Sequence, residues 1–440
     1  MRLLFLLGYE NAMVAQKFFV IPAMPFTCYN TQTSHVYLKK CLNFLLAAVI
    51  WSHLLMTSTS SYAEAAGLIL GEDDSLIPPE QVSDQDIKED INFLLPVFAR
   101  GYGGYKVHPI DLIKAVEKDF ETIGLSGTTM PTKIFCKKIA VAFHRLPDSH
   151  LNASLPNFKC SDIEERKGRV GSNVLPIADR INNRPWKLSR VRVDGLNVSV
   201  LGIIKFPPAN DSSWHGFEET YKSLLKQPLI IIDLRGNQGG DDTRGFELAN
   251  FLNGGPPPFN AEQRIMRRTP EAIALRLNRF LLMKRKANKP NIAINDSIRE
   301  LLSLYDQAKS GSVTQEVVDQ LDHKRKSPSG NKIYSGKIYI LGDADCGSSG
   351  ESTLDALRSI PNAKFVGENT AGVLQFGNVG KIVLPRSKIQ IQMGTQFVRY
   401  RDNQMVETVG FAPDIRVPPG NDALVWAIRH FNQSRQISNP

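Results

Sequence analysis

The hydrophobic pattern of the chain changes near residue 190, from helical spacing to strand-like runs. Before that point, apolar residues recur at helical spacing in three stretches: Ile87, Ile91, Leu94, Leu95 and Phe98; Ile113, Val116, Phe120 and Ile123; and Phe135, Ile139, Ala142 and Phe143. Ser83 and Asp86 have the spacing of a capping box before the first stretch. We therefore predict a helical N-terminal domain over residues 64–150, ending in the loop Asp148-Ser149-His150.

Short apolar runs dominate the chain after residue 190. The sequence VRVDGLNVSVLGIIKF predicts a hairpin with its turn at Asp194-Gly195, and residues 229–234, 338–341 and 363–366 have the continuous apolar character of buried strands. The first run leads into RGNQGG and a helix, and the second leads into a loop and another helix. This order predicts an α/β core over residues 151–440.

A basic insertion interrupts this core at about residues 256–333. Thr269-Pro270-Glu271 has the features of a helix start, and we predict a helical insertion that forms a cap or lid. Residues 261–326 hold 14 Lys and Arg against 8 Asp and Glu, so the net charge of +9 comes largely from this segment. Such local charge does not predict a nucleic-acid-binding protein. A lid carrying Arg267, Arg268, Lys284 and Arg285 would favour ligands with acidic groups or a free carboxylate; the alternative is a solvated face.

Composition excludes some protein classes, and the N-terminal segment predicts the cellular compartment of the protein. With 440 residues, 42% hydrophobic and 22% charged, the chain is an ordinary globular protein, and a multispan membrane protein is excluded. Residues 41–56 follow two lysines and precede small residues, as in a signal peptide, so we predict a presequence over residues 1–63 with cleavage after Ala63 or Ala65. A signal anchor is the alternative. The mature protein is then periplasmic or secreted, with no stable membrane span.

Of the five cysteines, Cys136, Cys160 and Cys346 remain after the presequence is removed. In an oxidising compartment the simplest arrangement is a Cys136–Cys160 disulfide and one free thiol, and three reduced cysteines are the alternative. No Cys or His spacing typical of a metal site is present.

Two turns rich in small residues follow the buried runs. In CGSSGESTL, Ser348 and Ser349 stand at a helix start, where backbone amides suit an oxyanion, although helix capping alone also explains them. Gly239 or Gly240 could offer an amide to a carbonyl oxygen, and no phosphate-loop motif is present. His150 follows a Pro-Asp loop, but spacing alone does not make it a base.

Four segments in order resemble the tail-specific, or C-terminal processing, serine peptidase family: LIIIDLRGNQGG, GSSGESTLDAL, FVGENTAG, and VETVGFAPDI followed by NDALVWAI. The resemblance extends from residue 191 to residue 431. It implies that Ser348, three residues before Glu351, is the nucleophile, and that the Ser349 amide completes an oxyanion hole opposite Gly239.

The chain departs from the processing proteases proper in two respects. Val373 stands where those enzymes have a lysine base, and the segment between residues 150 and 191 does not match a PDZ module. The chain is more similar to relatives of the tricorn core protease, and this resemblance implies His150 as base, with Ser149 and Glu407 holding and polarising the machinery.

The resemblance implies a crotonase-like ββα core and a serine-type peptidase, acting within chains or at their C-termini on a peptide or protein substrate. It implies no metal and no organic cofactor. The subunit number is left open, with a homo-oligomer as one outcome. A non-catalytic ligand-binding protein on the same scaffold and an esterase-type serine hydrolase are the alternatives.

Overall fold

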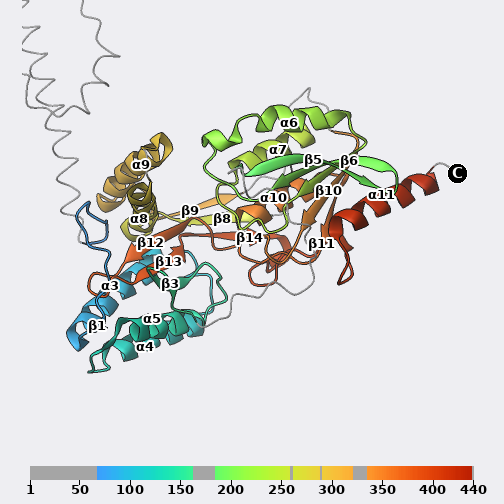
Figure 1. The fold of residues 1–440 in the computed structure, drawn as a ribbon. Coiled ribbons are helices and arrows are strands. Elements are labelled where there is room, and N and C mark those ends of the chain that lie inside the picture. The colour runs from blue at the N-terminus through green and yellow to red at the C-terminus, as the bar shows by residue number, and fades with distance from the viewer. Residues whose placement is uncertain (1–66, 162–183, 258–260, 288–289, 321–333, 439–440) are drawn as a thin grey trace, which may run out of the picture. The chain divides into compact units, whose positions relative to one another are not determined.

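The computed structural model describes residues 67–161, 184–257, 261–287, 290–320 and 334–438, and residues 65–440 form one compact unit. The largest sheet has the strand order β15-β11-β10-β7-β6-β5 (Figure 1). Its strands are β5 (Trp186–Val193), β6 (Leu196–Ile203), β7 (Leu229–Asp233), β10 (Lys337–Gly342), β11 (Ala363–Gly367) and β15 (Ile415–Arg416). Strands β5 and β6 form an antiparallel hairpin, and the other neighbours are parallel. The predicted hairpin and the three predicted buried strands are confirmed.

Helices cover both faces of this sheet. Because successive strand residues point to opposite faces, Ile230 and Ile232 of β7 pack with one set of helices, whereas Leu229 and Ile231 pack with another. The first face holds α6 (Phe217–Ser223), α7 (Thr243–Asn253) and α10 (Ser349–Arg358), together with the 3-10 turns η2 (Ser212–Trp214) and η3 (Leu224–Lys226); the second holds α11 (Ala423–Ser438). Burial on both sides explains the continuous apolar runs. The mixed α/β character of the chain is therefore confirmed.

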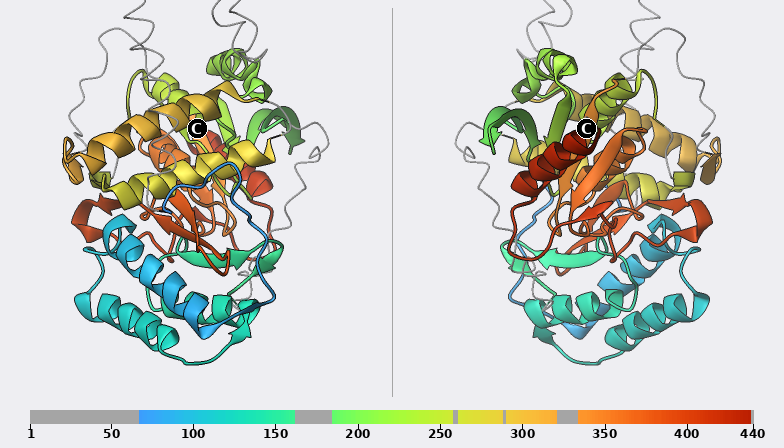
Figure 2. Two further views of the ribbon diagram at one scale, coloured as in Figure 1. Left: turned by 90° about the vertical axis from the view of Figure 1, so that its left-hand side faces the viewer. Right: turned by 90° about the vertical axis from the view of Figure 1, so that its right-hand side faces the viewer.

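The N-terminal helices share a second core with strands from distant parts of the chain (Figure 2). These helices are α3 (Asp84–Gly101), α4 (Ile110–Gly124) and α5 (Thr132–Phe143), with the short strands β1 (Gln81–Val82) and β2 (Met130–Pro131) beside them. The three predicted helices are confirmed, and so is the capping box, in which the Ser83 side chain accepts from the Asp86 amide at 3.1 Å. The helices pack on a sheet of order β12-β13-β3-β4: β3 (Asn152–Leu155), β4 (Phe158–Lys159), β12 (Val379–Val383) and β13 (Gln390–Gly394).

The basic insertion contains strands as well as helices. It comprises β8 (Ala261–Arg267), α8 (Pro270–Lys286), α9 (Ile292–Lys309) and β9 (Glu316–Gln320). The predicted start of α8 is confirmed, since the Thr269 hydroxyl accepts from the Ala272 amide at 3.2 Å. The sequence interpretation predicted helices here but not strands. Strand β8 pairs with β9 and with the distant β14 (Gln396–Tyr400), which precedes the turn η4 (Arg401–Asn403).

The cysteines adopt the first of the two predicted arrangements. Cys136 and Cys160 form a disulfide, with 5.4 Å between their Cα atoms, and Cys346 is free and buried. The predicted presequence lies outside the described residues. Within the described ranges, no helix has both the length and the apolar character needed to cross a membrane.

Candidate active site

The two small-residue turns meet at one edge of the large sheet. Strands β7 and β10 are parallel neighbours, so the loops at their carboxyl ends lie side by side, where α/β sheets commonly place their sites. Two hydrogen bonds join these loops. The Gly236 amide donates to Asp343 Oδ1 at 2.9 Å, and the Gly347 amide donates to the Asn237 carbonyl at 2.9 Å.

Ser348 lies at the junction between the second loop and α10, in a conformation that serine rarely adopts. Its φ is 53° and its ψ is −120°, a region normally left to glycine because of steric conflict with Cβ. Such strain persists only where neighbouring structure imposes it, and it is common at functional sites. A serine on a sharp turn between strand and helix is also the arrangement that exposes the nucleophile in other hydrolases.

Backbone amides available to an oxyanion lie next to Ser348. The Gly239 amide donates to Asn237 Oδ1 at 2.9 Å and is therefore engaged. Among the described residues, no acceptor engages the amides of Gly240 and Ser349, and both residues line the same cavity as Ser348. A Cβ at Gly239 would lie 2.7 Å from Ser348 Cβ and 2.8 Å from the Ser349 nitrogen, so this close approach requires glycine.

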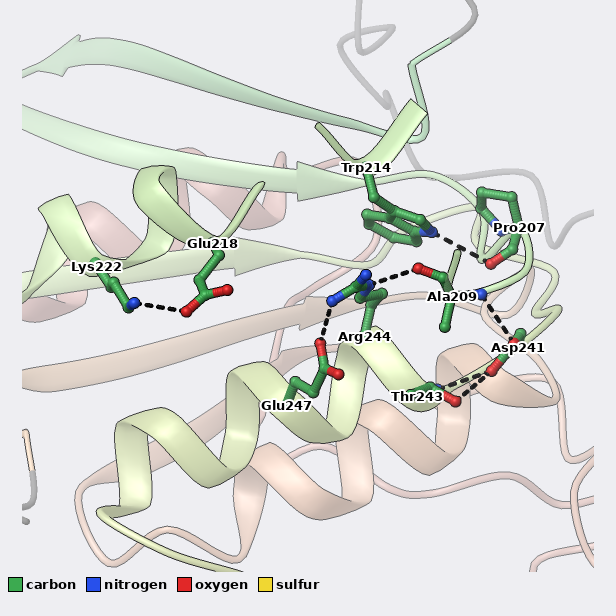
Figure 3. A network of polar contacts seen from close by, with 9 residues as sticks. All are labelled: Pro207, Ala209, Trp214, Glu218, Lys222, Asp241, Thr243, Arg244 and Glu247. Carbon is green, nitrogen blue, oxygen red and sulfur yellow. Dashed lines mark hydrogen bonds and ion pairs between the residues drawn. The ribbon is translucent and has the colours of Figure 1, made fainter. Parts of the chain in front are cut away.

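The loop carrying Gly240 is supported from its other side. A Cβ at Gly240 would lie 1.8 Å from the Phe206 carbonyl oxygen, which accepts from the Asp241 amide at 2.8 Å. Figure 3 shows the surrounding contacts: Asp241 accepts from the Ala209 amide at 3.0 Å, and the Arg244 guanidinium donates to the Ala209 carbonyl at 2.9 Å. These contacts hold the start of α7 against the segment that follows β6.

Glu351, in the first turn of α10, holds Ser348 to a third segment. Its carboxylate accepts from the Ser348 amide at 3.2 Å and from the amides of Gly372 and Val373 at 2.8 Å each, and it also accepts from Thr370 Oγ1 at 2.5 Å. Burial raises the pKa of Glu351 to about 7, and these hydrogen bonds oppose that shift. Glu351 therefore fixes the backbone around Ser348.

Glu407 anchors the loop that carries the candidate base. It is 1% exposed, and Oε1 accepts from the Ser149 amide at 3.0 Å, whereas Oε2 accepts from the amides of Leu374 and Gln375 at 3.1 and 3.0 Å. Burial raises the pKa of Glu407, and hydrogen bonds from Ser149 and the other amides oppose that shift. Glu407 thus acts on His150 through its neighbour Ser149.

His150 is held chiefly by its backbone. Its amide donates to Asp148 Oδ1 at 2.8 Å, and its carbonyl accepts from Gln392 Nε2 at 3.2 Å. The Nδ1 atom is buried and has no hydrogen-bond partner within the described ranges. Burial lowers the pKa of the imidazole to about 4. The Phe376 carbonyl opposes this shift, and the positive charge of Arg279 adds to it. A neutral imidazole can accept a proton.

Asp148 links this loop to the N-terminal core. Its Oδ2 accepts from the Tyr102 hydroxyl at 2.7 Å, and that hydroxyl lies 2.8 Å from His108 Nε2. Burial, and then the nearby Glu407 charge, raises the pKa of Asp148 to about 7. The loop is therefore fixed by two buried carboxyl groups on different sides.

A cavity of about 2170 Å³ brings the sequence candidates to one surface. Ser348, Ser349, Gly240, Ser149 and His150 line it. Glu407 and Gly239 lie behind this lining, in contact with Ser149 and Ser348 as described above. In the described part of the chain, no hydrogen bond joins Ser348 Oγ to the imidazole. In structures without substrate, such catalytic hydrogen bonds are often long and shorten only when substrate binds.

The sequence interpretation did not assign roles to Glu351, Asp148 or Tyr102. For Glu351, the capping-box spacing from Ser348 was a usable signal in the sequence. Asp148 directly precedes the Ser149-His150 pair, but its burial depends on α3 and could not be seen in the sequence. The described residues contain no cluster of three or more His, Cys, Asp or Glu side chains able to hold a metal ion.

Comparisons with known proteins agree with the geometry at the family level. Residues 200–417 match the family described as Peptidase family S41, and this segment contains both strand-end turns and Glu407. A serine on such a turn beside available amides is the arrangement that serine-type hydrolases use. Residues 200–417 are thus similar to peptidase family S41, a family of serine peptidases.

Relatives and solved structures are distant. The chain is 24% identical over 241 residues to the nisin-resistance protein of Lactococcus lactis subsp. lactis, covering 54% of this chain and 62% of that protein, so it spans less than two thirds of the relative's length. A putative peptidase from Parabacteroides merdae aligns with a TM-score of 0.47 at 12% identity, over 80% of this chain and 96% of that one. Mature CPAF aligns with a TM-score of 0.48 at 14% identity, over 79% and 95%.

Proposed function

We propose that this chain hydrolyses peptide bonds with Ser348 as nucleophile and His150 as general base, in a site of the tricorn-like subgroup built on a crotonase-like core. The observation that carries the proposal is the positive φ of Ser348 at the start of α10, next to the unengaged amides of Gly240 and Ser349. Glu407 and Ser149 are positioning residues that hold His150 at the same cavity.

The reaction follows from these positions. Ser348 Oγ attacks the peptide carbonyl carbon while its proton passes to His150, and the developing oxyanion accepts hydrogen bonds from the Gly240 and Ser349 amides. The C–N bond then breaks, and the imidazolium returns its proton to the leaving amine. Water then attacks the acyl carbon of the resulting ester while its proton passes to His150. The bond between the acyl carbon and Ser348 Oγ breaks, His150 returns the proton to Ser348 Oγ, and the acid product leaves.

Labelling with a fluorophosphonate probe tests the proposal, because the probe reacts with an activated serine in proportion to its nucleophilicity. We expect Ser348→Ala to abolish labelling and turnover of peptide substrates, while the free energy of unfolding changes by no more than about 1 kcal/mol. Ser349→Ala is the matched control. It loses the hydrogen bond from Ser349 Oγ to the Gly240 carbonyl at 2.9 Å but keeps the backbone amide, so we expect it to retain labelling.

If Ser349→Ala lost labelling and Ser348→Ala retained it, the nucleophile would be Ser349 and not Ser348. No labelling in the unmodified protein, together with no turnover, would favour the ligand-binding alternative. Labelling with turnover of esters alone would favour an esterase-type hydrolase.

The compartment is part of the proposal. A periplasmic or secreted location agrees with the predicted signal peptide and with the Cys136–Cys160 disulfide, because disulfides persist mainly in oxidising compartments.

A further inference from the structure

Three cationic side chains line one wall of the cavity that holds Ser348 and His150. Arg279 and Lys286 come from α8, and Lys381 comes from β12. On α8, the lining residues Arg279, Leu282, Met283 and Lys286 follow the spacing of a single helix face. The residues singled out from the sequence are placed differently: Arg267 is buried near Glu316, and Arg285 donates to backbone carbonyls outside the cavity.

Close packing fixes these cations relative to each other. A Cβ at Gly380 would lie 2.5 Å from the Leu275 carbonyl carbon, so glycine at this position lets α8 approach β12 closely. Arg279 Nη1 donates to the Val379 carbonyl at 3.1 Å, which holds the guanidinium against β12 and leaves its other donors free of protein acceptors among the described residues.

No acidic side chain within the described ranges forms an ion pair with Arg279, Lys286 or Lys381. Burial lowers the pKa of Lys381, and the charges of Lys286 and Arg279 lower it further, so the three groups repel one another. Five aspartates line other parts of the cavity wall: Asp148, Asp242, Asp319, Asp345 and Asp355. Asp319 pairs with Arg264 at 2.9 Å and Asp355 with Arg358 at 3.0 Å. The charge of Asp241 acts on Arg279 without forming an ion pair with it. A group of three cations without ion-pair partners among the described residues is suited to an anionic ligand.

The cation cluster lies on the same side of the cavity as the base. Lys381 faces Gln392 across the β12–β13 pair, and cross-strand neighbours have Cβ atoms about 5 Å apart. Gln392 in turn donates to the His150 carbonyl at 3.2 Å. Because His150 must protonate the leaving amine, the substrate segment beyond the scissile bond passes this side.

We propose that Arg279, Lys286 and Lys381 form an anion subsite that binds a carboxylate on the leaving segment of the peptide substrate, either its C-terminal carboxylate or an acidic side chain. This inference rests on the proposed peptidase function and adds the substrate class.

Matched pools of quenched fluorescent peptides test the subsite. One pair of pools ends in a free carboxylate or an amide, and a second pair, both amidated, carries Glu or Gln near the C-terminus. We expect the charged member of at least one pair to be cleaved with a lower KM. Lys381→Gln and Lys286→Gln each raise that KM about tenfold and leave the uncharged pool unchanged. Lys284→Gln, an exposed change on the same helix outside the cavity lining, is the control.

Binding to Ser348→Ala protein, measured by fluorescence anisotropy, separates the two proposals. A preference for the charged peptide without turnover in the unmodified protein would leave the subsite standing and overturn the peptidase proposal. Equal cleavage and equal binding of charged and uncharged pools would overturn the subsite alone. Preference for the free acid identifies the C-terminal carboxylate as the ligand, whereas preference for Glu identifies an acidic side chain.

Discussion

At the scale of single residues, the surroundings of His150 determine the pH range expected for the proposed mechanism. A base must be neutral to accept a proton, and burial lowers the pKa of this imidazole to about 4, from an ordinary value of about 6.5. We expect kcat/KM for a peptide substrate to rise as the pH increases through about 4 and to be close to its plateau at pH 6.5.

The measurement is a pH–rate profile on the unmodified enzyme, at pH values where fluorescence shows that it is folded. An acidic limb centred near pH 6.5 would mean that the imidazole is solvated in the working enzyme. His150→Ala serves as the control, because its residual rate should lose this limb altogether.

The residue scale also shows what the sequence could predict about the site. Ser348 and Glu407 were accessible through the resemblance to family motifs, and a strand, turn and helix pattern also surrounds Ser348. The engagement of the Gly239 amide by Asn237 and the burial of Asp148 by Tyr102 were not accessible. Both depend on side-chain contacts that carry no periodic signal.

At the scale of elements, the first turn of α10 depends on Glu351. Its carboxylate connects α10 to the segment that contains Gly372 and Val373, where the processing proteases have their lysine. We expect Glu351→Gln to lower the free energy of unfolding by about 1–3 kcal/mol, because one buried acceptor becomes a donor facing other donors. The rate of fluorophosphonate labelling should fall as well, because the Ser348 backbone loses its support.

Urea denaturation and labelling kinetics at a temperature where the variant is folded would measure these two effects. Glu247→Gln is a matched control, since Glu247 pairs with Arg244 on α7 and is partly exposed. Unchanged labelling by a folded Glu351→Gln protein would show that Glu351 has no part in positioning Ser348.

The insertion shows why some elements escaped prediction. The start of α8 was predictable because Thr269, Pro270 and Glu271 form a local signal. Strands β8 and β9 are short, charged and only partly buried, and β8 obtains its other partner from β14, far along the chain. Strand formation there depends on tertiary pairing more than on local preference.

At the scale of the whole molecule, the Cys136–Cys160 disulfide closes the segment that carries His150. A cross-link with a sequence separation of 24 stabilises mainly by restricting the unfolded chain, by about 3 kcal/mol for a loop of roughly this length. We expect Cys160→Ala to lower the free energy of unfolding by about this amount, as measured by urea denaturation.

Added reductant should destabilise the unmodified protein to a similar extent and leave Cys160→Ala unaffected. Identical denaturation curves for the unmodified protein with and without reductant would contradict the prediction. This pairing was one of two arrangements that the sequence left open, because cysteine counts do not report distance.

The hydrogen bond from Ser149 to Glu407 spans a sequence separation of 258 residues, and this span has a consequence in time. A chain that emerges from the ribosome or crosses a membrane with its N-terminus first presents the histidine segment early and the serine turn much later. The glutamate that holds the histidine segment appears later still. Under the proposed mechanism, the base is therefore not held in place until Glu407 has been added, so we expect an incomplete chain to have no peptidase activity.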